Sequence, residues 1–193
     1  MEIVRNIFVS LIDHFAAMTV LEKTTGILAM IFCISAFLLK NRKAILVVQL
    51  IGMGLWTVHF FLLGQYAGAA MNGIAAIRGL IYVQRGRFKW TESKIIPAAF
   101  IVLFIGAGLF TFFYGGDNNF WLPVIAMTIT SIGLFFKDEQ RVRLISLFSS
   151  PPWIVYNALA RSIPAVITES LVMLATFLGL VIYRKKKTAP ENK

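Results

Sequence analysis

The sequence predicts an all-α integral membrane protein. Its seven transmembrane helices form two parallel three-helix repeats joined by a linker helix (3+1+3), after an N-terminal amphipathic helix. Composition gives the first indication: of 193 residues, 58% are hydrophobic and 15% are charged, and the mean hydropathy is +0.76. Such a chain has too few polar side chains to cover itself in water, so lipid must be the solvent for much of it.

The apolar runs divide the chain into elements. Residues 1–18 carry apolar side chains at helical spacing and polar ones on the other side, which predicts a helix lying in the membrane interface. A partner-binding helix is the alternative for this segment. Seven spans follow, each close to the roughly 20 residues that cross a bilayer. They are placed at 20–39, 44–63, 66–84, 95–114, 119–136, 142–160 and 163–183.

An internal match predicts the two repeats. A shift of 97 residues places Trp56 on Trp153 and Asn72 on Glu169. The gapless register extends over roughly 50 residues, as an internal duplication predicts. The expected organisation is a first repeat at 19–94, a linker helix at 95–114, a second repeat at 115–187 and a cytoplasmic tail at 188–193. An odd linker helix gives both repeats the same orientation in the membrane.

The basic residues predict the orientation. Fifteen of the 19 Lys and Arg residues fall after spans one, three and seven or around the turn between spans five and six. Cytoplasmic loops are enriched in Lys and Arg, so the C-terminus should be cytoplasmic and the N-terminus outside. The net charge of +10 therefore reflects membrane topology, and no nucleic-acid partner is expected.

Two motifs carry a resemblance to known proteins. The second helix of each repeat has Trp three residues before His or Tyr, as WTVH at 56–59 and WIVY at 153–156. With a polar residue in the following helix, this resembles the SWEET/PQ-loop (MtN3-like) superfamily. More closely, HFFLLGQYAGA with AIR, and SSPPWIVYNALARSI, look like the YgjV-like bacterial inner-membrane protein family. The resemblance covers about residues 20–185. It implies the fold and a bacterial inner (plasma) membrane location, and supplies no activity.

The resemblance has departures. The position where the family is expected to carry an Asn is Ala75. The paired third-helix asparagines of sugar carriers correspond to Asn72 and Glu169, and the Pro-Gln dipeptide is absent. The resemblance therefore does not extend to sugar specificity.

Polar residues inside spans are the candidate functional residues, because they are costly in lipid. Glu169 could take up a proton, as a proton-coupled carrier requires; the alternative is a carboxylate neutralised by a neighbour for assembly. Arg78 could pair with Glu169 or with an anionic solute, or it could extend to the headgroups. The candidate substrate-binding residues are Trp56, His59, Asn72, Arg78, Trp153, Tyr156, Asn157 and Glu169.

The aromatic candidates also have two interpretations. Trp56 and Trp153 could flank a solute, with His59, Tyr156 and Asn157 as hydrogen-bonding groups. Interfacial anchoring and core packing are the alternatives. In addition, the Ser149–Pro152 segment is expected to interrupt the sixth span near its middle.

Two functions remain open at this point. One is a SWEET-like small-solute carrier with a central cavity between the repeats. The other is a non-transporting receptor, assembly factor or scaffold on the same fold. No enzyme, cofactor or metal site is expected, because the sequence lacks HExxH, GxSxG, a phosphate-binding loop and a Cys/His cluster. The expected partners are the lipid bilayer, a small polar solute and further copies of this chain.

Overall fold

A computed structural model describes residues 2–39, 42–84, 86–136 and 138–188. All regular structure in these residues is helical. Lys40, Arg85, Lys137 and all but the first residue of the predicted tail lie outside the described residues. The helices are α1 (Glu2–Ala17), α2 (Val20–Ser35), η1 (Ala36–Leu38), α3 (Arg42–Leu62), α4 (Tyr66–Val83), η2 (Lys89–Glu92), α5 (Ile95–Gly115), α6 (Trp121–Gly133), α7 (Glu139–Leu159) and α8 (Ile163–Thr188).

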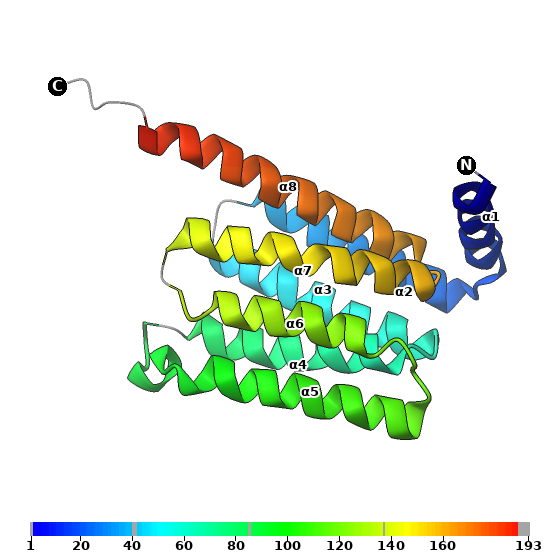
Figure 1. Ribbon diagram of the computed structural model, residues 1–193, viewed down its shortest axis with the longest axis horizontal. Coiled ribbons are helices and arrows are strands. Elements are labelled where there is room, and N and C mark those ends of the chain that lie inside the picture. Colours follow the sequence, from blue (N-terminus) through cyan, green and yellow to red (C-terminus); the bar gives the residue numbers. More distant parts are fainter. Residues whose placement is uncertain (1, 40–41, 85, 137, 189–193) are drawn as a thin grey trace.

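Helices α2 to α8 lie side by side in one bundle (Figure 1). Six of them form a ring, in which α2, α3 and α4 pack in chain order and α6, α7 and α8 do the same. The ring closes through contacts of α2 with α8 and of α4 with α6. Helix α5 packs against α4 and α6 and is not part of the ring, because α4 and α6 also contact each other directly. A region between the two triplets is therefore enclosed by six helices.

The two ends of the bundle differ (Figure 1). The hairpin end carries the turns that join α3 to α4, α5 to α6 and α7 to α8. The opposite end carries the connections between α2 and α3, between α4 and α5 and between α6 and α7, together with the end of α8. We call it the basic end, because most Lys and Arg residues of the sequence fall in or next to these segments. Glycines with positive φ make two of the hairpin-end turns: Gly64 has φ +69° and Gly116 has φ +66°. Most side chains are strained at such φ values, whereas glycine is not.

Local sequence signals explain where several helices begin. Helix α2 starts with a capping box, in which the Glu22 N–H donates to Thr19 Oγ1 and the Thr19 N–H donates to Glu22 Oε2. This cap separates α2 from α1, and the chain bends by 116° between the two helices. Helix α1 therefore points away from the bundle axis and contacts α8 at the hairpin end.

The expected interruption of the sixth span is wrong. Helix α7 is continuous from Glu139 to Leu159, with Pro151 and Pro152 inside it. Each proline has a helical φ but removes a backbone hydrogen bond and crowds the preceding turn, so the packing of α7 against α6 and α8 outweighs this cost.

Three helices among the described residues are long and apolar enough to cross a membrane: Ala44–Leu62, Ile95–Gly115 and Ile163–Ile182. These correspond to the second, fourth and seventh predicted spans. A fourth qualifies only if the bent pair of Val9–Ala17 and Val20–Ser35 is counted as one span. Helix α6 is apolar but has only 13 residues. The all-helical prediction is confirmed, and the seven-span 3+1+3 arrangement stays a prediction.

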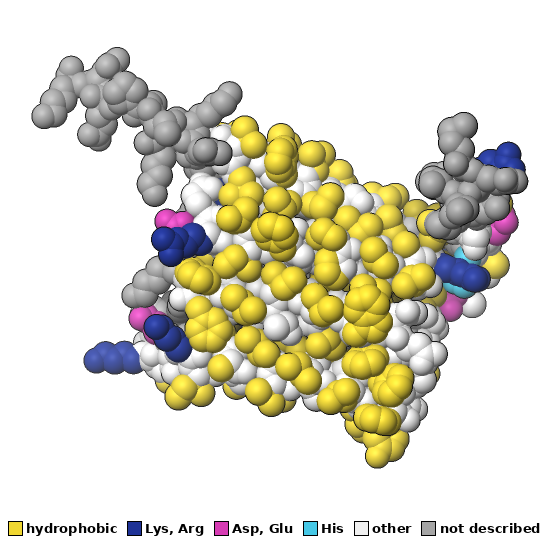
Figure 2. Space-filling view, in the orientation of Figure 1, with side chains coloured by type: hydrophobic (Ala, Val, Ile, Leu, Met, Phe, Trp, Pro, Cys, Tyr) yellow, Lys and Arg dark blue, Asp and Glu magenta, His cyan; other side chains and the backbone are white. Residues whose placement is uncertain are grey.

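Hydrophobic side chains dominate the face of the bundle in Figure 2, and the Lys and Arg side chains visible there lie near its two ends. Large apolar residues on α5 are strongly exposed, including Val102 at 69% and Phe113 at 72%. A monomer in water rarely exposes so wide an apolar surface, whereas in a membrane the lipid chains cover it.

Candidate functional site

A cavity of about 200 Å³ lies inside the helical ring. Helices α2, α3, α4, α6, α7 and α8 all contribute to its wall. Six of the eight predicted site residues line it: Trp56, Asn72, Arg78, Trp153, Asn157 and Glu169. Residues 97 positions apart in the sequence, such as Asn72 and Glu169, therefore meet at one site. The other lining residues are Cys33, Met53, Phe60, Ala75, Met127, Ala165, Thr168 and Val172.

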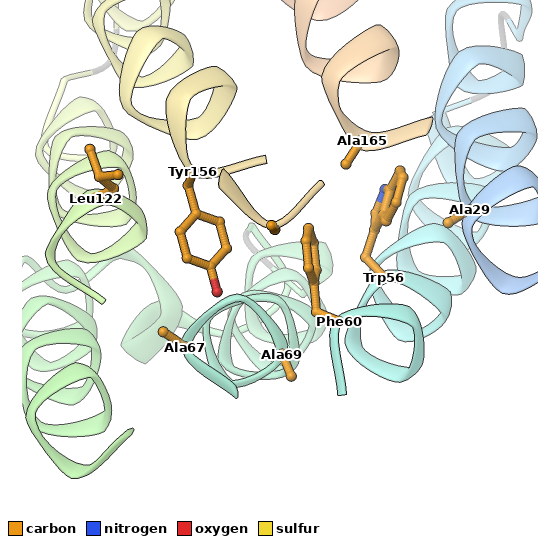
Figure 3. Packing of buried hydrophobic residues seen from close by; sticks show 9 residues of the cluster. Ala29, Trp56, Phe60, Ala67, Ala69, Leu122, Tyr156 and Ala165 are labelled. Atoms are coloured by element: carbon orange, nitrogen blue, oxygen red, sulfur yellow. The ribbon is translucent and has the colours of Figure 1, made fainter. Parts of the chain in front are cut away.

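Aromatic rings form the apolar wall of the cavity. Phe60 lies between the two tryptophans, with ring centroids 5.8 Å from Trp56 and 6.5 Å from Trp153. Figure 3 shows Phe60 and Trp56 among the small side chains Ala29, Ala69 and Ala165. The Trp56 indole N–H donates to Cys33 Sγ at 3.3 Å. Since Phe60 occupies the space between them, the tryptophans form one continuous apolar surface instead of two opposed plates.

Arg78 provides a positive charge at the cavity. Its guanidinium donates to Ser131 Oγ at 2.7 Å and to Thr130 Oγ1 at 3.4 Å, both on α6. It also lies over the Phe104 ring, 5.3 Å from the centroid. The side chain is thus held between α4, α5 and α6, and it does not pair with Glu169 among the described residues, which was one of the alternatives that the sequence left open.

The remaining polar lining residues differ in how well they are bonded. Asn72 Nδ2 donates to the Gly68 carbonyl at 2.9 Å. Asn157 Nδ2 donates to the Ala165 carbonyl at 3.3 Å, but its buried Oδ1 accepts no hydrogen bond from the described residues. Glu169 forms a side-chain hydrogen bond with Ser150 of α7. The cavity therefore contains a carboxyl group on its α7–α8 side, whereas Asn157 Oδ1 has almost no surface exposed to the cavity.

His59 does not line the cavity and is fully buried beside it. Its Nε2 is 2.8 Å from Ser162 Oγ at the start of α8, and its Nδ1 is 2.9 Å from the Glu22 carbonyl of α2. Thr25 Oγ1 lies 3.5 Å from the same Nδ1. His59 thus connects three helices of the ring at the hairpin end.

Tyr156 has a similar position in the second triplet and is also fully buried. Its hydroxyl donates to Asp117 Oδ2 at 3.0 Å and accepts from the Gly68 N–H at 2.7 Å. Asp117 Oδ2 also accepts from the Ala67 N–H at 3.2 Å. Tyr156 therefore joins α7 to the beginning of α4 and to the α5–α6 turn, and Figure 3 shows its hydroxyl directed toward α4.

Sequence reasoning missed the partners of these residues. Asp117 follows Gly115-Gly116 in a predicted outer turn, and an acid at that place is a signal that could have been read as a helix cap. Ser162, Thr130 and Ser131 carry no sequence signal that separates them from other small hydroxyl residues in apolar segments. Only their distances to His59 and Arg78 identify them.

These observations define a helical integral membrane protein whose bundle contains a mainly apolar cavity with a few polar side chains in its wall. Comparison with known proteins gives the particular family. Residues 20–188 match the Imp-YgjV family, described as a bacterial inner membrane protein, and the chain belongs to this family. It is 29% identical over 161 residues to the inner membrane protein YgjV of Escherichia coli (strain K12), covering 83% of each chain.

The family resemblance seen in the sequence and the inner membrane location are therefore confirmed. Membership of the wider SWEET/PQ-loop superfamily stays a prediction. No solved structure matches this chain significantly.

Proposed function

We propose that this protein is a small-solute carrier of the SWEET-like type, with the cavity as its binding site. The observation that carries the proposal is a cavity of about 200 Å³ whose wall combines aromatic, amide, carboxyl and guanidinium groups from six helices. Binding sites for small solutes are usually apolar hollows with a few placed polar groups. The volume is below the roughly 300–1,000 Å³ of drug-sized pockets, so the proposed solute is small.

The proposal includes the 3+1+3 arrangement of seven spans. Two features support it. The contacts of α2 with α8 and of α4 with α6 are equivalent when α2–α4 are taken as one repeat and α6–α8 as the other. His59 and Tyr156, which match under the 97-residue shift, each connect the central helix of a repeat to the N-terminal end of the other repeat's third helix.

The proposed orientation places the basic end in the cytoplasm, so that the N-terminus is outside and the C-terminus inside. Fusions test this directly. A fluorescent protein fused after Lys193 should be bright in cells, and alkaline phosphatase at the same place should be inactive. The opposite pair of results would reverse the orientation.

Access to the cavity from both sides is the test of the carrier. Ala75 is 5% exposed and lines the cavity, so Ala75→Cys in a Cys33→Ala background gives a reporter with little change in volume. A membrane-impermeant maleimide should label it in right-side-out and in inside-out vesicles, because alternating access opens one site to each side in turn. Val102→Cys, on the exposed face of α5, should react in neither preparation.

The result that would overturn the carrier is labelling of Ala75→Cys from one side only, or from neither, in a variant that elutes as wild type from a sizing column. The alternative would then hold: a receptor, assembly factor or scaffold that keeps the fold without a path through it. Asn118→Cys, in the exposed α5–α6 turn, is the control that the reagent reaches the outer side.

A further inference from the structure

Two charged side chains line the cavity without an ion pair among the described residues. Arg78 donates only to the neutral hydroxyls of Thr130 and Ser131. A guanidinium carries five N–H groups, so it has donors left for another acceptor. Charges removed from water are costly unless an opposite charge compensates them. The geometry at Arg78 therefore fits an anionic group of the solute, and a carboxylate matches the guanidinium fork.

The α7–α8 side of the cavity has the opposite character. Glu169 lines the cavity, and its hydrogen-bond partner is the neutral Ser150 hydroxyl. No cationic side chain pairs with Glu169 among the described residues. A buried carboxylate of this kind fits a positively charged group with several N–H donors, which a protonated amine supplies.

We propose that the cavity binds a small zwitterion, a solute that carries a carboxylate and a protonated amine on a short carbon skeleton. The carboxylate binds Arg78, the ammonium group binds Glu169, and the apolar part lies against Trp56 and Phe60. This inference rests on the proposed binding site and specifies its substrate class. A simple acid would leave Glu169 uncompensated, and a simple amine would leave Arg78 uncompensated. A neutral sugar would compensate neither charge.

The test uses solutes that differ only in their charged groups. β-Alanine, propionate and ethylamine share a two-carbon skeleton, and glycine or γ-aminobutyrate with their matched acids and amines give shorter and longer series. Equilibrium binding of the radiolabelled zwitterions is measured on purified protein in detergent, with the acids and amines as competitors. One zwitterion should bind at least about tenfold more tightly than its matched acid and amine, because each lost charge-assisted bond costs about that factor.

Two variants assign the ends of the solute. Arg78→Gln should abolish binding of the zwitterion. Glu169→Gln should reduce zwitterion binding to the level of the matched acid, because only the ammonium group loses its partner. Arg87→Gln and Glu92→Gln remove the same charges at exposed positions of the basic end and should leave binding unchanged. The selectivity of the wild-type protein decides the question even if a cavity variant fails to fold.

Each other result overturns the inference. If an acid binds as tightly as its zwitterion, and if the Glu169→Gln variant binds both as the wild type does, the cavity is an anion site. Preference for glucose over every zwitterion would make it a site for neutral solutes and leave the carrier standing. If no zwitterion binds but Ala75→Cys is labelled from both sides, the substrate class is wrong and the carrier survives. Failure of both tests overturns both proposals.

Discussion

Replacing Tyr156 by Phe removes a single oxygen atom from the hairpin end of the bundle. This atom makes two hydrogen bonds, at 3.0 Å to Asp117 Oδ2 and at 2.7 Å from the Gly68 N–H. Tyr156 is 0% exposed, so water cannot replace them. A hydrogen bond to a charged group contributes about 1.5–3 kcal/mol, and an unsatisfied buried N–H costs about 1–3 kcal/mol. We expect a loss of about 2–4 kcal/mol in the free energy of unfolding.

The assay is unfolding of the detergent-solubilised protein by increasing sodium dodecyl sulfate, followed by tryptophan fluorescence. Tyr66→Phe is the matched control, because Tyr66 is 39% exposed and its hydroxyl has no hydrogen-bond partner among the described residues. Interhelical hydrogen bonds in membrane proteins average about 0.6 kcal/mol. A loss for Tyr156→Phe below that value, or equal to the control, would refute the view that this hydroxyl holds α4 and α7 together.

Three further substitutions test close packing and helix capping. Gly26→Ala would place a methyl group 2.6 Å from the His59 ring, which hydrogen bonds hold in place, so we expect a loss of about 1–3 kcal/mol in the same assay. Gly54 has open space around it, so Gly54→Ala should be neutral or stabilising by up to about 1 kcal/mol. An equal loss of stability for Gly26→Ala and Gly54→Ala would contradict the close contact between Gly26 and the His59 ring. Thr19→Ala removes the capping box with Glu22 and should cost about 1 kcal/mol, and an unchanged unfolding curve would show that α2 does not depend on its cap.

The sequence by itself determined the class of the protein and most of its helices. Apolar runs of about 20 residues have one stable form in lipid, because only a helix satisfies its own backbone hydrogen bonds there. The capping pair Thr19 and Glu22 and the glycine turn at Gly64 are equally local, so the element boundaries near them could be predicted. The Pro151-Pro152 prediction failed because a proline pair lowers helix propensity without forbidding the helix, and packing of α7 against its neighbours outweighs that preference.

Only the tertiary structure decided which polar residues share the site. The repeat placed Asn72 opposite Glu169, and both line the cavity. The same repeat could not show that His59 bonds to Ser162 before α8, or that Tyr156 bonds to Gly68 at the start of α4. These partners are 103 and 88 residues away along the chain. Nor could the repeat show that Arg78 binds hydroxyls of α6 instead of Glu169. Sequence pattern reports which face of a helix is polar, whereas the partner of each side chain depends on how the helices are packed.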